Sequence, residues 1–316
     1  MAVYLVTGGA GFIGSALTRA LLTRGHRVRV AENFSTGKRE NLAGILDQIE
    51  LFEVDVCDLE SLREPLQGVD FVLHEAALPS VPRSIQDPLR SNRVNVEGTL
   101  NVLLAARDAH VKRVVYAASS SAYGDTPTLP KVESMQPHPI SPYGITKFAG
   151  ELYAQIFARV YGLETVSLRY FNVFGPRQDP SSPYSGVLSK FITAALRGEK
   201  PTIYGDGEQS RDFTYVDNVV EATLLACTAA QAVGKVINIA TGTRQTLNQV
   251  LATLSRILNS EIVANHDPQR AGDILHSLAN IQQAREVLGY EPKVPFEAGL
   301  RKTVEWYRLN PLATIV

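Results

Sequence analysis

The feature that most restricts the fold is a glycine-rich turn near the start of the chain, within MAVYLVTGGAGFIGSAL. Three glycines recur at three-residue spacing, at Gly8, Gly11 and Gly14. An apolar segment, Val3–Thr7, precedes them, and a helix-like segment, Gly14–Arg24, follows. Glycine costs backbone entropy and is kept where a chain turns tightly or approaches another group closely. The order of strand, glycine turn and helix predicts a parallel α/β unit whose turn can hold a phosphate.

The same alternation continues along much of the chain. Short apolar segments rich in β-branched residues, without in–out alternation, are typical of buried parallel strands. We expect these strands at Val28–Ala31, Leu51–Val54, Phe71–His74, Arg113–Ala117, Thr165–Tyr170 and Val236–Ala240, with a further strand and helix within Thr214–Thr228. The longest helix-like segments are Asn95–Ala109 and Tyr143–Tyr161. The predicted fold class is α/β, a doubly wound parallel sheet of the Rossmann type with a smaller mixed C-terminal substrate lobe.

The composition changes after Phe171, and we place a domain boundary there. The segment 172–186, NVFGPRQDPSSPYSG, is rich in Gly, Pro and Ser and predicts a long loop, of a kind that is usually functional. We assign residues 1–172 and about 214–242 to a dinucleotide-binding domain. Residues 173–213 and 243–316 form the predicted substrate-binding lobe.

Charge and cysteine content argue against several classes of partner. The 316-residue chain has a formal net charge of −1, which gives no reason to expect a nucleic acid or a membrane surface. Cys57 and Cys227 lie far apart and show no metal-ligand spacing. We therefore expect reduced thiols, no metal site and a cytoplasmic protein. The first strand begins too early to leave room for a cleavable leader.

Glu32 follows the second predicted strand, at the position where dinucleotide-binding folds carry an acid. Its carboxylate would accept a hydrogen bond from a ribose 2′-hydroxyl and repel a 2′-phosphate, which favours NAD over NADP. A solvated carboxylate at a strand end is the alternative. Lys38 and Arg39 lie close by in sequence and would suit a 2′-phosphate, so the sequence leaves the preference open.

A second motif, SPYGITKFAGELY, begins with helix-start residues Ser141 and Pro142 and places Tyr143 and Lys147 four residues apart on one face. The lysine ammonium and a positive nicotinamide ring would both favour the phenolate, so that Tyr143 can act as a base near neutral pH. The serines 119–121 end a strand where a parallel sheet presents its site residues, and a hydroxyl there can relay a proton. Taken alone, a surface Tyr–Lys pair and a polar loop explain both motifs.

Together these motifs resemble the extended short-chain dehydrogenase/reductase family, and within it the nucleotide-sugar 4-epimerases. The resemblance spans nearly the whole chain and rests on TGGAGFIG, YGITK, FEVDVCD, HEAAL and LRYFNVFGPR. It implies NAD as cofactor, although Glu32 stands where many relatives carry Asp. It implies Tyr143, Lys147 and Ser119, four residues before Tyr123, as the catalytic residues. The NAD-binding residues that it implies are Gly8, Gly11, Phe12, Ile13, Gly14, Glu32, Asn33, Ser35, Thr36, Gly37, Asp55, Val56, Ala76, Ala77, Leu78, Asn95, Ala117, Tyr143, Lys147, Tyr170 and Val173.

The same resemblance implies a UDP-sugar substrate and a 4-keto intermediate. Tyr143, assisted by Ser119, would take the proton of the sugar 4-hydroxyl while the C4 hydride passes to NAD and returns to the other face of the rotated sugar. Arg211 and Arg270 would hold the pyrophosphate, because guanidinium groups suit phosphate oxygens; an arginine taken alone is more often an ordinary surface residue. The substrate-binding residues that it implies are Ser80, Arg83, Ser84, Ser119, Ser120, Tyr143, Asn172, Val187, Leu188, Phe191, Tyr204, Arg211, Arg270, Asp273 and Ser277.

Other reactions of this family are less compatible with the sequence. Its 4,6-dehydratases carry an acidic pair directly after the catalytic Thr, and its decarboxylases carry a glutamate in the same loop, whereas serines follow Ser119 here. Epimerisation of UDP-glucuronate stays open, because Arg83 or Arg177 would suit a carboxylate. A non-catalytic NAD-sensing regulator would be expected to have lost the tyrosine or the lysine, and both are present.

Ser277 bears on the size of the sugar. Epimerases restricted to plain hexoses resemble one another in carrying a bulky tyrosine there, so a serine leaves room for a 2-acetamido group. SVPRSIQDP and FNVFGPRQDP also resemble the matching segments of UDP-N-acetylglucosamine 4-epimerases. We therefore expect UDP-N-acetylglucosamine and UDP-N-acetylgalactosamine among the substrates. The alternative is an enzyme for UDP-glucose and UDP-galactose alone.

The helix Tyr143–Tyr161 also predicts an oligomer. It carries two apolar stripes, one of which can face the sheet and leave the other for a partner. The first stripe is Ile145, Ala149, Leu152, Ile156 and Val160, and the second is Tyr153, Phe157 and Tyr161. Relatives pair this helix with the one at Asn95–Ala109 in a four-helix contact, which implies a homodimer. The alternative is that both stripes belong to the core.

Overall fold

The computed structural model describes residues 1–180, 186–269 and 274–310. Its centre is a parallel sheet of seven strands in the order β11-β6-β5-β4-β1-β2-β3. The strands are β1 (Val3–Thr7), β2 (Arg27–Glu32), β3 (Glu50–Glu53), β4 (Phe71–His74), β5 (Arg113–Ser119), β6 (Glu164–Tyr170) and β11 (Val236–Ile239). Each lies within two residues of a predicted strand, so the doubly wound α/β fold is confirmed.

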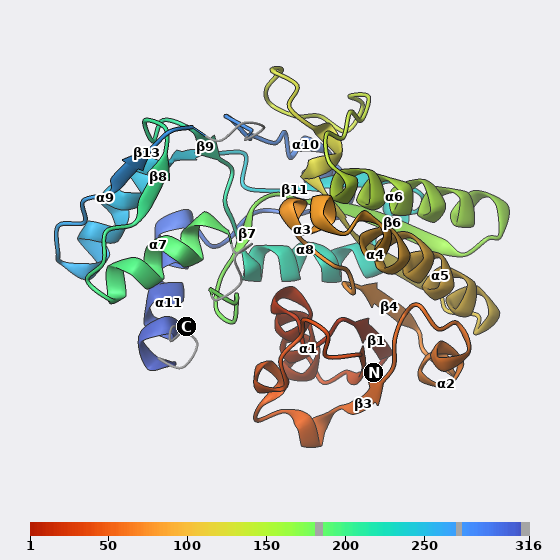
Figure 1. Ribbon diagram of the computed structural model, residues 1–316. Helices are drawn as coiled ribbons and strands as arrows, with labels where there is room; N and C mark the ends of the chain where they lie inside the picture. Colours follow the sequence, from red (N-terminus) through yellow and green to blue (C-terminus); the bar gives the residue numbers. More distant parts are fainter. Residues whose placement is uncertain (181–185, 270–273, 311–316) are drawn as a thin grey trace.

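Helices cover both faces of this sheet (Figure 1). Leu17 and Leu21 of α1 are buried in one core cluster, with residues of α8, and Leu103 of α5 and Phe157 of α6 are buried in the other. The helices of this part are α1 (Phe12–Thr23), α2 (Arg63–Leu66), α3 (Val81–Gln86), α4 (Pro88–Asn92), α5 (Gly98–Asp108), α6 (Pro142–Val160), α8 (Val216–Thr228) and α10 (Gln282–Leu288). Within the described residues, no helix is both long and apolar enough to cross a bilayer.

A smaller group of elements lies to the left of the sheet in Figure 1. Its helices are α7 (Val187–Leu196), α9 (Leu247–Leu258) and α11 (Phe296–Leu309). Three short strand pairs lie outside the central sheet: β7 (Val173–Phe174) with β10 (Thr214–Tyr215), β8 (Thr202–Tyr204) with β13 (Asn265–Asp267), and β9 (Ser210–Arg211) with β12 (Gln245–Thr246). The predicted loop 172–186 therefore contains one short strand. The proposed domain boundaries stay a prediction.

One predicted helix begins differently from our expectation. The segment Asn95–Ala109 starts inside a π-helical turn, Arg93–Glu97, and α5 begins only at Gly98. The wide turn carries Asn95 inward, where its Nδ2 donates to the Leu78 carbonyl at 3.2 Å and its Oδ1 accepts from the Leu78 N–H at 2.7 Å. Such turns within helices often occur at functional sites.

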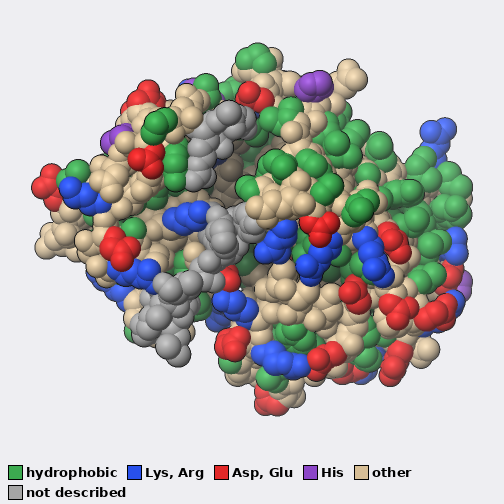
Figure 2. All heavy atoms as spheres, in the orientation of Figure 1, with side chains coloured by type: hydrophobic (Ala, Val, Ile, Leu, Met, Phe, Trp, Pro, Cys, Tyr) green, Lys and Arg blue, Asp and Glu red, His purple; other side chains and the backbone are tan. Residues whose placement is uncertain are grey.

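The outer surface of α6 is apolar. Ile145, Leu152, Ile156 and Val160 are 56%, 47%, 47% and 62% exposed, whereas Phe157 of the other stripe is buried. Figure 2 shows hydrophobic side chains gathered at the upper right, where Figure 1 places α6. The first predicted stripe therefore faces away from the core. We call Ile145, Leu152, Ile156 and Val160 the α6 stripe.

The strand order places a crevice at one edge of the sheet. The strand order reverses between β1 and β4. In open parallel sheets, ligands bind at such a point, outside the carboxyl ends of the strands. Gly8 follows β1 with φ of +69°, and a Cβ atom there would lie 2.8 Å from the backbone of Ala76, just after β4. Only glycine allows this close approach of the two strand ends.

Candidate active site

A cleft of about 830 Å³ opens at this edge of the sheet. It is lined by residues that follow β1, β2, β4, β5 and β6, so segments far apart in sequence converge there. The predicted NAD-binding residues that line it are Gly8, Gly11, Phe12, Ile13, Gly14, Glu32, Asn33, Ser35, Thr36, Gly37, Val56, Ala76, Ala77, Leu78, Ala117, Tyr143, Lys147, Tyr170 and Val173. Two others, Asp55 and Asn95, are not part of this lining.

Asp55 and Asn95 each form hydrogen bonds with a residue that lines the cleft. The Asp55 carboxylate accepts hydrogen bonds from Asn33 Nδ2 at 3.0 Å and from the Cys57 N–H at 2.8 Å. Asn95 is buried and fixes the backbone of Leu78 through the two hydrogen bonds described above. Both residues thus shape the walls without being part of them.

The glycine turn fits the pyrophosphate of a dinucleotide. A Cβ atom at Gly14 would lie 2.2 Å from the Gly8 carbonyl oxygen, so the turn closes against the start of α1 only with glycine. No side chain caps α1 at Gly11, and Phe12 and Ile13 of its first turn line the cleft. Uncapped N–H groups at a helix start form a ready site for a phosphate.

Glu32 lies at the end of β2 and is 6% exposed. Its Oε2 accepts from the Ala10 N–H at 3.1 Å, and its Oε1 accepts from the N–H groups of Asn33 and Phe34, both at 3.0 Å. Burial raises the pKa of this carboxyl, and the backbone hydrogen bonds oppose the rise. The alternative of a solvated strand-end carboxylate is therefore wrong. A carboxylate oxygen keeps a further lone pair for a ribose hydroxyl.

Helix α6 starts as its sequence predicts and presents Tyr143 and Lys147 to the cleft. Ser141 Oγ accepts from the Gly144 N–H at 3.1 Å, and proline occupies the first helical position. The Tyr143 N–H donates to Ser84 Oγ at 3.0 Å. These contacts fix the first turn of α6, which carries the tyrosine.

Ser119 is the last residue of β5 and lies beside the tyrosine. Its Oγ accepts hydrogen bonds from the Ser121 hydroxyl at 2.9 Å and from the Ser121 N–H at 3.2 Å. A hydrogen bond also joins the Ser119 hydroxyl to the Tyr143 phenol, where it lowers the phenol pKa. Both bonds from Ser121 leave the Ser119 proton available for the tyrosine.

Lys147 lies one turn after Tyr143 and is 4% exposed. Its Nζ sits over the ring of Tyr116, 4.7 Å from the centroid. Burial lowers the pKa of the ammonium to about 8, and the negative charges of Glu75 and Glu151 oppose this fall. The lysine is thus a buried cation placed between two acids.

The pKa of Tyr143 differs from our expectation that Lys147 lowers it. Burial raises this pKa above its ordinary value, the charge of Glu75 adds to the rise, and only the hydrogen bond with Ser119 opposes it. The physical reason is that burial is the largest cause, because the phenolate loses more solvation than the Ser119 hydrogen bond restores. The protein by itself therefore keeps the tyrosine as a phenol. The positive nicotinamide ring, which is the other part of the expectation, would have to lower the pKa of Tyr143.

Comparison with known proteins agrees with this geometry. Residues 4–240 match the NAD dependent epimerase/dehydratase family. The chain belongs to this family. Its cofactor is NAD, and the resemblance found in the sequence is confirmed.

Three relatives of this epimerase/dehydratase are similar over their whole length. A UDP-glucose 4-epimerase of Mycolicibacterium smegmatis is 38% identical over 309 residues, covering 96% of this chain and 98% of that one. The structure of UDP-N-acetylglucosamine 4-epimerase from Methanobrevibacter ruminantium M1, in complex with UDP-N-acetylmuramic acid, is 42% identical with a TM-score of 0.94 and covers 98% of this chain and 99% of that one. The structure of UDP-glucose 4-epimerase from Thermotoga maritima with UDP-glucose is 41% identical with a TM-score of 0.93 and covers 98% and 99%.

Most of the predicted substrate-binding residues line one of two cavities. Ser80, Arg83, Ser119, Ser120, Tyr143 and Asn172 line the cleft described above. Val187, Phe191, Tyr204 and Arg211 line a second cavity of about 710 Å³. Gly186 lines the first cavity and Val187 the second, so both open at the start of α7. Arg270 and Asp273 lie outside the described residues.

Two predicted substrate residues are not exposed to either cavity. Ser84 is fully buried, and its hydroxyl donates to the Val81 carbonyl at 2.7 Å while accepting from Tyr143. Leu188 is 3% exposed and packs in the core. Neither side chain lines a cavity, and the assignment of these two residues to the sugar and uridine pockets stays a prediction.

Ser277 lies beside the first cavity without lining it. Its Oγ accepts a hydrogen bond from Asn172 Nδ2 at 3.4 Å, and the same nitrogen donates to the Asp212 carbonyl at 3.0 Å. Asn172 lines the cleft, and its φ of +37° is unusual for a residue with a side chain. Ser277 therefore contacts the cleft wall through Asn172.

Glu75 lines the cleft and was not among the predicted site residues. It belongs to the HEAAL segment, directly after β4, where an acid at the carboxyl end of a parallel strand is itself a usable signal. Arg177, which the sequence suggested only for a uronic acid, also lines the cleft, as does its neighbour Gln178.

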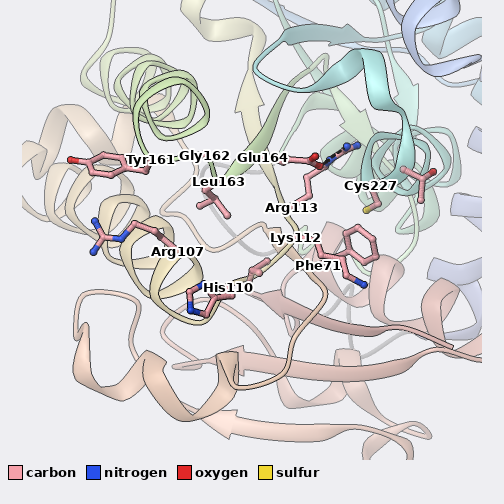
Figure 3. A pocket seen from close by; sticks show the side chains of 12 residues that line it. Phe71, Arg107, His110, Lys112, Arg113, Tyr161, Gly162, Leu163, Glu164 and Cys227 are labelled. Atoms are coloured by element: carbon pink, nitrogen blue, oxygen red, sulfur yellow. Dashed lines mark hydrogen bonds and ion pairs between the residues drawn. The ribbon is translucent and has the colours of Figure 1, made fainter.

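A separate hollow of about 600 Å³ lies at the opposite, amino edge of the sheet (Figure 3). Its cations have partners already. Arg113 pairs with Glu164 at 2.7 Å, and Lys112 pairs with Asp70 at 2.6 Å. Arg107, also labelled there, pairs with its neighbour in sequence at 2.7 Å. This hollow is therefore built from structural ion pairs.

Proposed function

We propose that this chain is an NAD-dependent 4-epimerase of UDP-hexoses. The observation that carries the proposal is the convergence of Ser119, Tyr143 and Lys147 in the same cleft as the glycine turn. A base that removes a hydroxyl proton is useful there only beside a group that accepts a hydride. The similar proteins named above act on UDP-sugars at C4, which supports the same reaction class here.

Oxidation at C4 breaks an O–H bond and a C–H bond. The NAD bound in the cleft would supply the hydride chemistry, taking the C4 hydride and later returning it. Tyr143 receives the hydroxyl proton in the first half of the cycle and returns it in the second. Burial raises the pKa of Tyr143 and keeps it protonated. A positive nicotinamide ring nearby would lower this pKa and so favour the phenolate that accepts the proton.

Ser119 and Lys147 support this proton transfer in different ways. The Ser119 hydroxyl, already bonded to the tyrosine, can also reach the substrate hydroxyl and pass the proton between them. The buried Lys147 ammonium supplies a positive charge on the next turn of α6 and can bind the nicotinamide ribose. Neither group needs to change its own charge during the reaction.

Inversion at C4 requires tight binding of UDP and weak binding of the hexose, because the hexose has to rotate between the two hydride transfers. We assign the second cavity, with Arg211 and Tyr204, to UDP, and the part of the cleft with Ser80, Arg83 and Asn172 to the hexose. The two cavities open together at the start of α7, so one tethered molecule can span both. Under this proposal the sheet domain, residues 1–172 and about 214–242, binds NAD. The remaining lobe, 173–213 and 243–316, binds the UDP-sugar.

We extend the proposal to N-acetylated sugars. A serine at position 277 is small, and its neighbour Asn172 forms part of the cleft wall. This supports space for a 2-acetamido group. The plain UDP-glucose and UDP-galactose pair is the alternative substrate set, and UDP-glucuronate is a second one, favoured by the presence of Arg83 and Arg177 in the cleft.

The test is direct incubation of the purified protein with UDP-N-acetylglucosamine, UDP-glucose and UDP-glucuronate, with products resolved by chromatography. We expect the C4 epimer of the first two sugars. Conversion of UDP-glucuronate alone would support the second alternative. Products that have lost water or carbon dioxide, or no product from any sugar, would overturn the proposal.

We also propose that the protein is a homodimer in the cytoplasm. The exposed α6 stripe supports the dimer, because contiguous apolar side chains on a surface usually mark a contact site. Leu89 of α4 and Ile85 of α3, next to α6, are 83% and 63% exposed and extend the same surface. Both cysteines are free, which agrees with a reducing compartment.

A further inference from the structure

Glu75 is an acid in the catalytic part of the cleft with no role in the mechanism above. It follows β4 directly and lines the same cavity as Tyr143 and Lys147. Its Oε1 accepts a hydrogen bond from the Tyr170 hydroxyl at 3.0 Å, and that hydroxyl lies 2.9 Å from Thr223 Oγ1. Contacts from β6 and α8 thus hold the carboxylate in place.

The charges around Glu75 are unevenly balanced. The charges of Glu75 and Glu151 both raise the pKa of Lys147. Glu151 has its own cation, because Arg169 Nε and Nη2 donate to its two carboxylate oxygens at 2.9 and 2.7 Å. Within the described parts of the chain, no lysine, arginine or histidine nitrogen lies within ion-pair distance of the Glu75 carboxylate.

Other titratable groups face this carboxylate from each neighbouring element. Tyr143 and Lys147 face it from α6, and Tyr170 faces it from β6, with Cys227 of α8 beyond that tyrosine. Burial raises the pKa of Glu75 to about 7, while the Tyr170 hydrogen bond and the Lys147 charge lower it. An adjacent positive charge would therefore favour the ionised form.

The cofactor provides such a charge in only one of its two states. The nicotinamide ring is positive in NAD+ and neutral in NADH. The proton acceptor Tyr143 and the hydride acceptor must reach the same carbon, so the nicotinamide belongs at the Tyr143 end of the cleft. Glu75 lines the same cleft, and its charge acts on both Tyr143 and Lys147.

We propose that Glu75 is a positioning residue that places a negative charge at the nicotinamide end of the cleft and so favours the oxidised over the reduced form of the bound cofactor. The proposal requires NAD with its ring beside Tyr143, but it does not depend on which sugar is the substrate. Its consequence is that the hydride is returned to the keto sugar rather than kept on the cofactor.

The variant Glu75→Gln tests this charge. Glutamine keeps the size and can still accept the hydrogen bond from Tyr170, but it carries no charge. The holoenzyme is equilibrated with a redox dye at about pH 8.5, above the pKa of about 7, and bound NADH is read at its near-ultraviolet absorbance. At the same dye potential we expect the ratio of bound NADH to bound NAD+ to rise at least tenfold, because removing one unit charge within about 12 Å at a partly buried site has an effect of that size.

Glu133→Gln is the matched control. Glu133 is another half-buried glutamate whose pKa is raised by burial, but it bonds the Asn238 N–H instead of lining the cleft. We expect no change in the ratio for this variant. If Glu75→Gln loses its cofactor, the ratio of the Kd values for NAD+ and NADH reports the same quantity by a thermodynamic cycle.

A ratio for Glu75→Gln within twofold of the wild type would overturn the proposal and leave Glu75 as an anchor for Tyr170. An equal shift in Glu133→Gln would also overturn it. Because no sugar is added, these outcomes are independent of whether the protein epimerises a UDP-hexose.

Discussion

At the scale of single residues, Lys147 and Glu75 differ in their proposed role from Tyr143, which accepts and returns a proton. Lys147 and Glu75 are each held in place by neighbouring side chains, and neither transfers a proton in the proposed cycle. Tyr143 is a phenol whose pKa is raised by burial and lowered by Ser119, so its protonation responds to what binds beside it. This arrangement makes the tyrosine the most sensitive position in the site.

The variant Tyr143→Phe removes the phenol oxygen but keeps the ring and its packing. We expect epimerisation to fall by roughly 10²–10⁴-fold, the usual contribution of a general acid–base group. The Kd for the UDP-sugar, measured by calorimetry, should change little. Tyr161→Phe, at the exposed end of α6, is the control and should retain full activity. Near-normal turnover of Tyr143→Phe would contradict the mechanism.

The variant Ser277→Tyr tests the proposed sugar pocket. A tyrosine next to Asn172 would fill the space assigned to the 2-acetamido group. We expect turnover of the acetylated pair to be lost and turnover of UDP-glucose to remain, while Ser277→Ala converts both. The turnover rate of each variant is measured with UDP-N-acetylglucosamine and with UDP-glucose. An equal loss for both, or a wild-type enzyme that ignores the acetylated sugars, would refute the pocket assignment.

At the scale of elements, α6 and β6 are joined by a buried ion pair. Glu151 and Arg169 are 1% and 3% exposed, and two hydrogen bonds connect them, with Glu151 one turn beyond Lys147. The guanidinium also lies over the Tyr123 ring, 4.5 Å from its centroid. The pair therefore fixes α6 on the sheet directly behind the site.

Breaking this pair should destabilise the protein strongly. Arg169→Met leaves Glu151 as an uncompensated buried charge, and such a loss costs about 3–5 kcal/mol of the free energy of unfolding. Denaturant titration measures this change. The double variant Arg169→Met, Glu151→Leu removes both charges and should recover most of the stability. A single variant as stable as the wild type would contradict this account.

The sequence predicted elements better than side-chain directions. The glycine turn, the strands of the central sheet and the start of α6 follow from local patterns of apolar residues, glycine spacing and capping, and they appear within two residues of the expected positions. The burial of Ser84 and Leu188 was not predicted, because it depends on how the helices α3 and α7 pack, which no local pattern encodes. The π-helical turn at Asn95 was missed for a similar reason, since tertiary contacts to Leu78 define it.

At the scale of the whole molecule, the α6 stripe is the clearest surface feature that the fold leaves uncovered. An apolar surface of this kind favours association of two copies, since burying it removes apolar area from water. If two molecules pack through it, the stripe of each lies against the other, and a charge there would be buried without a partner.

The variant Leu152→Asp should therefore convert the proposed dimer to a monomer, with a twofold lower mass by sedimentation or light scattering. The control is Leu309→Asp on α11, which is equally a change of an exposed leucine but lies far from α6 (Figure 1). It should leave the mass unchanged. A wild-type protein that is monomeric at micromolar concentration would rule out this interface.

The central claim is that a hydride leaves C4 of the sugar and returns to the same carbon. The most direct measurement supplies UDP-N-acetylglucosamine and UDP-glucose with deuterium at C4 and examines the products by mass spectrometry and proton NMR. The account predicts C4-inverted products that keep the deuterium at C4, without net consumption of NAD. Products that have exchanged the deuterium with solvent, or recovery of both sugars without inversion at C4, would contradict it.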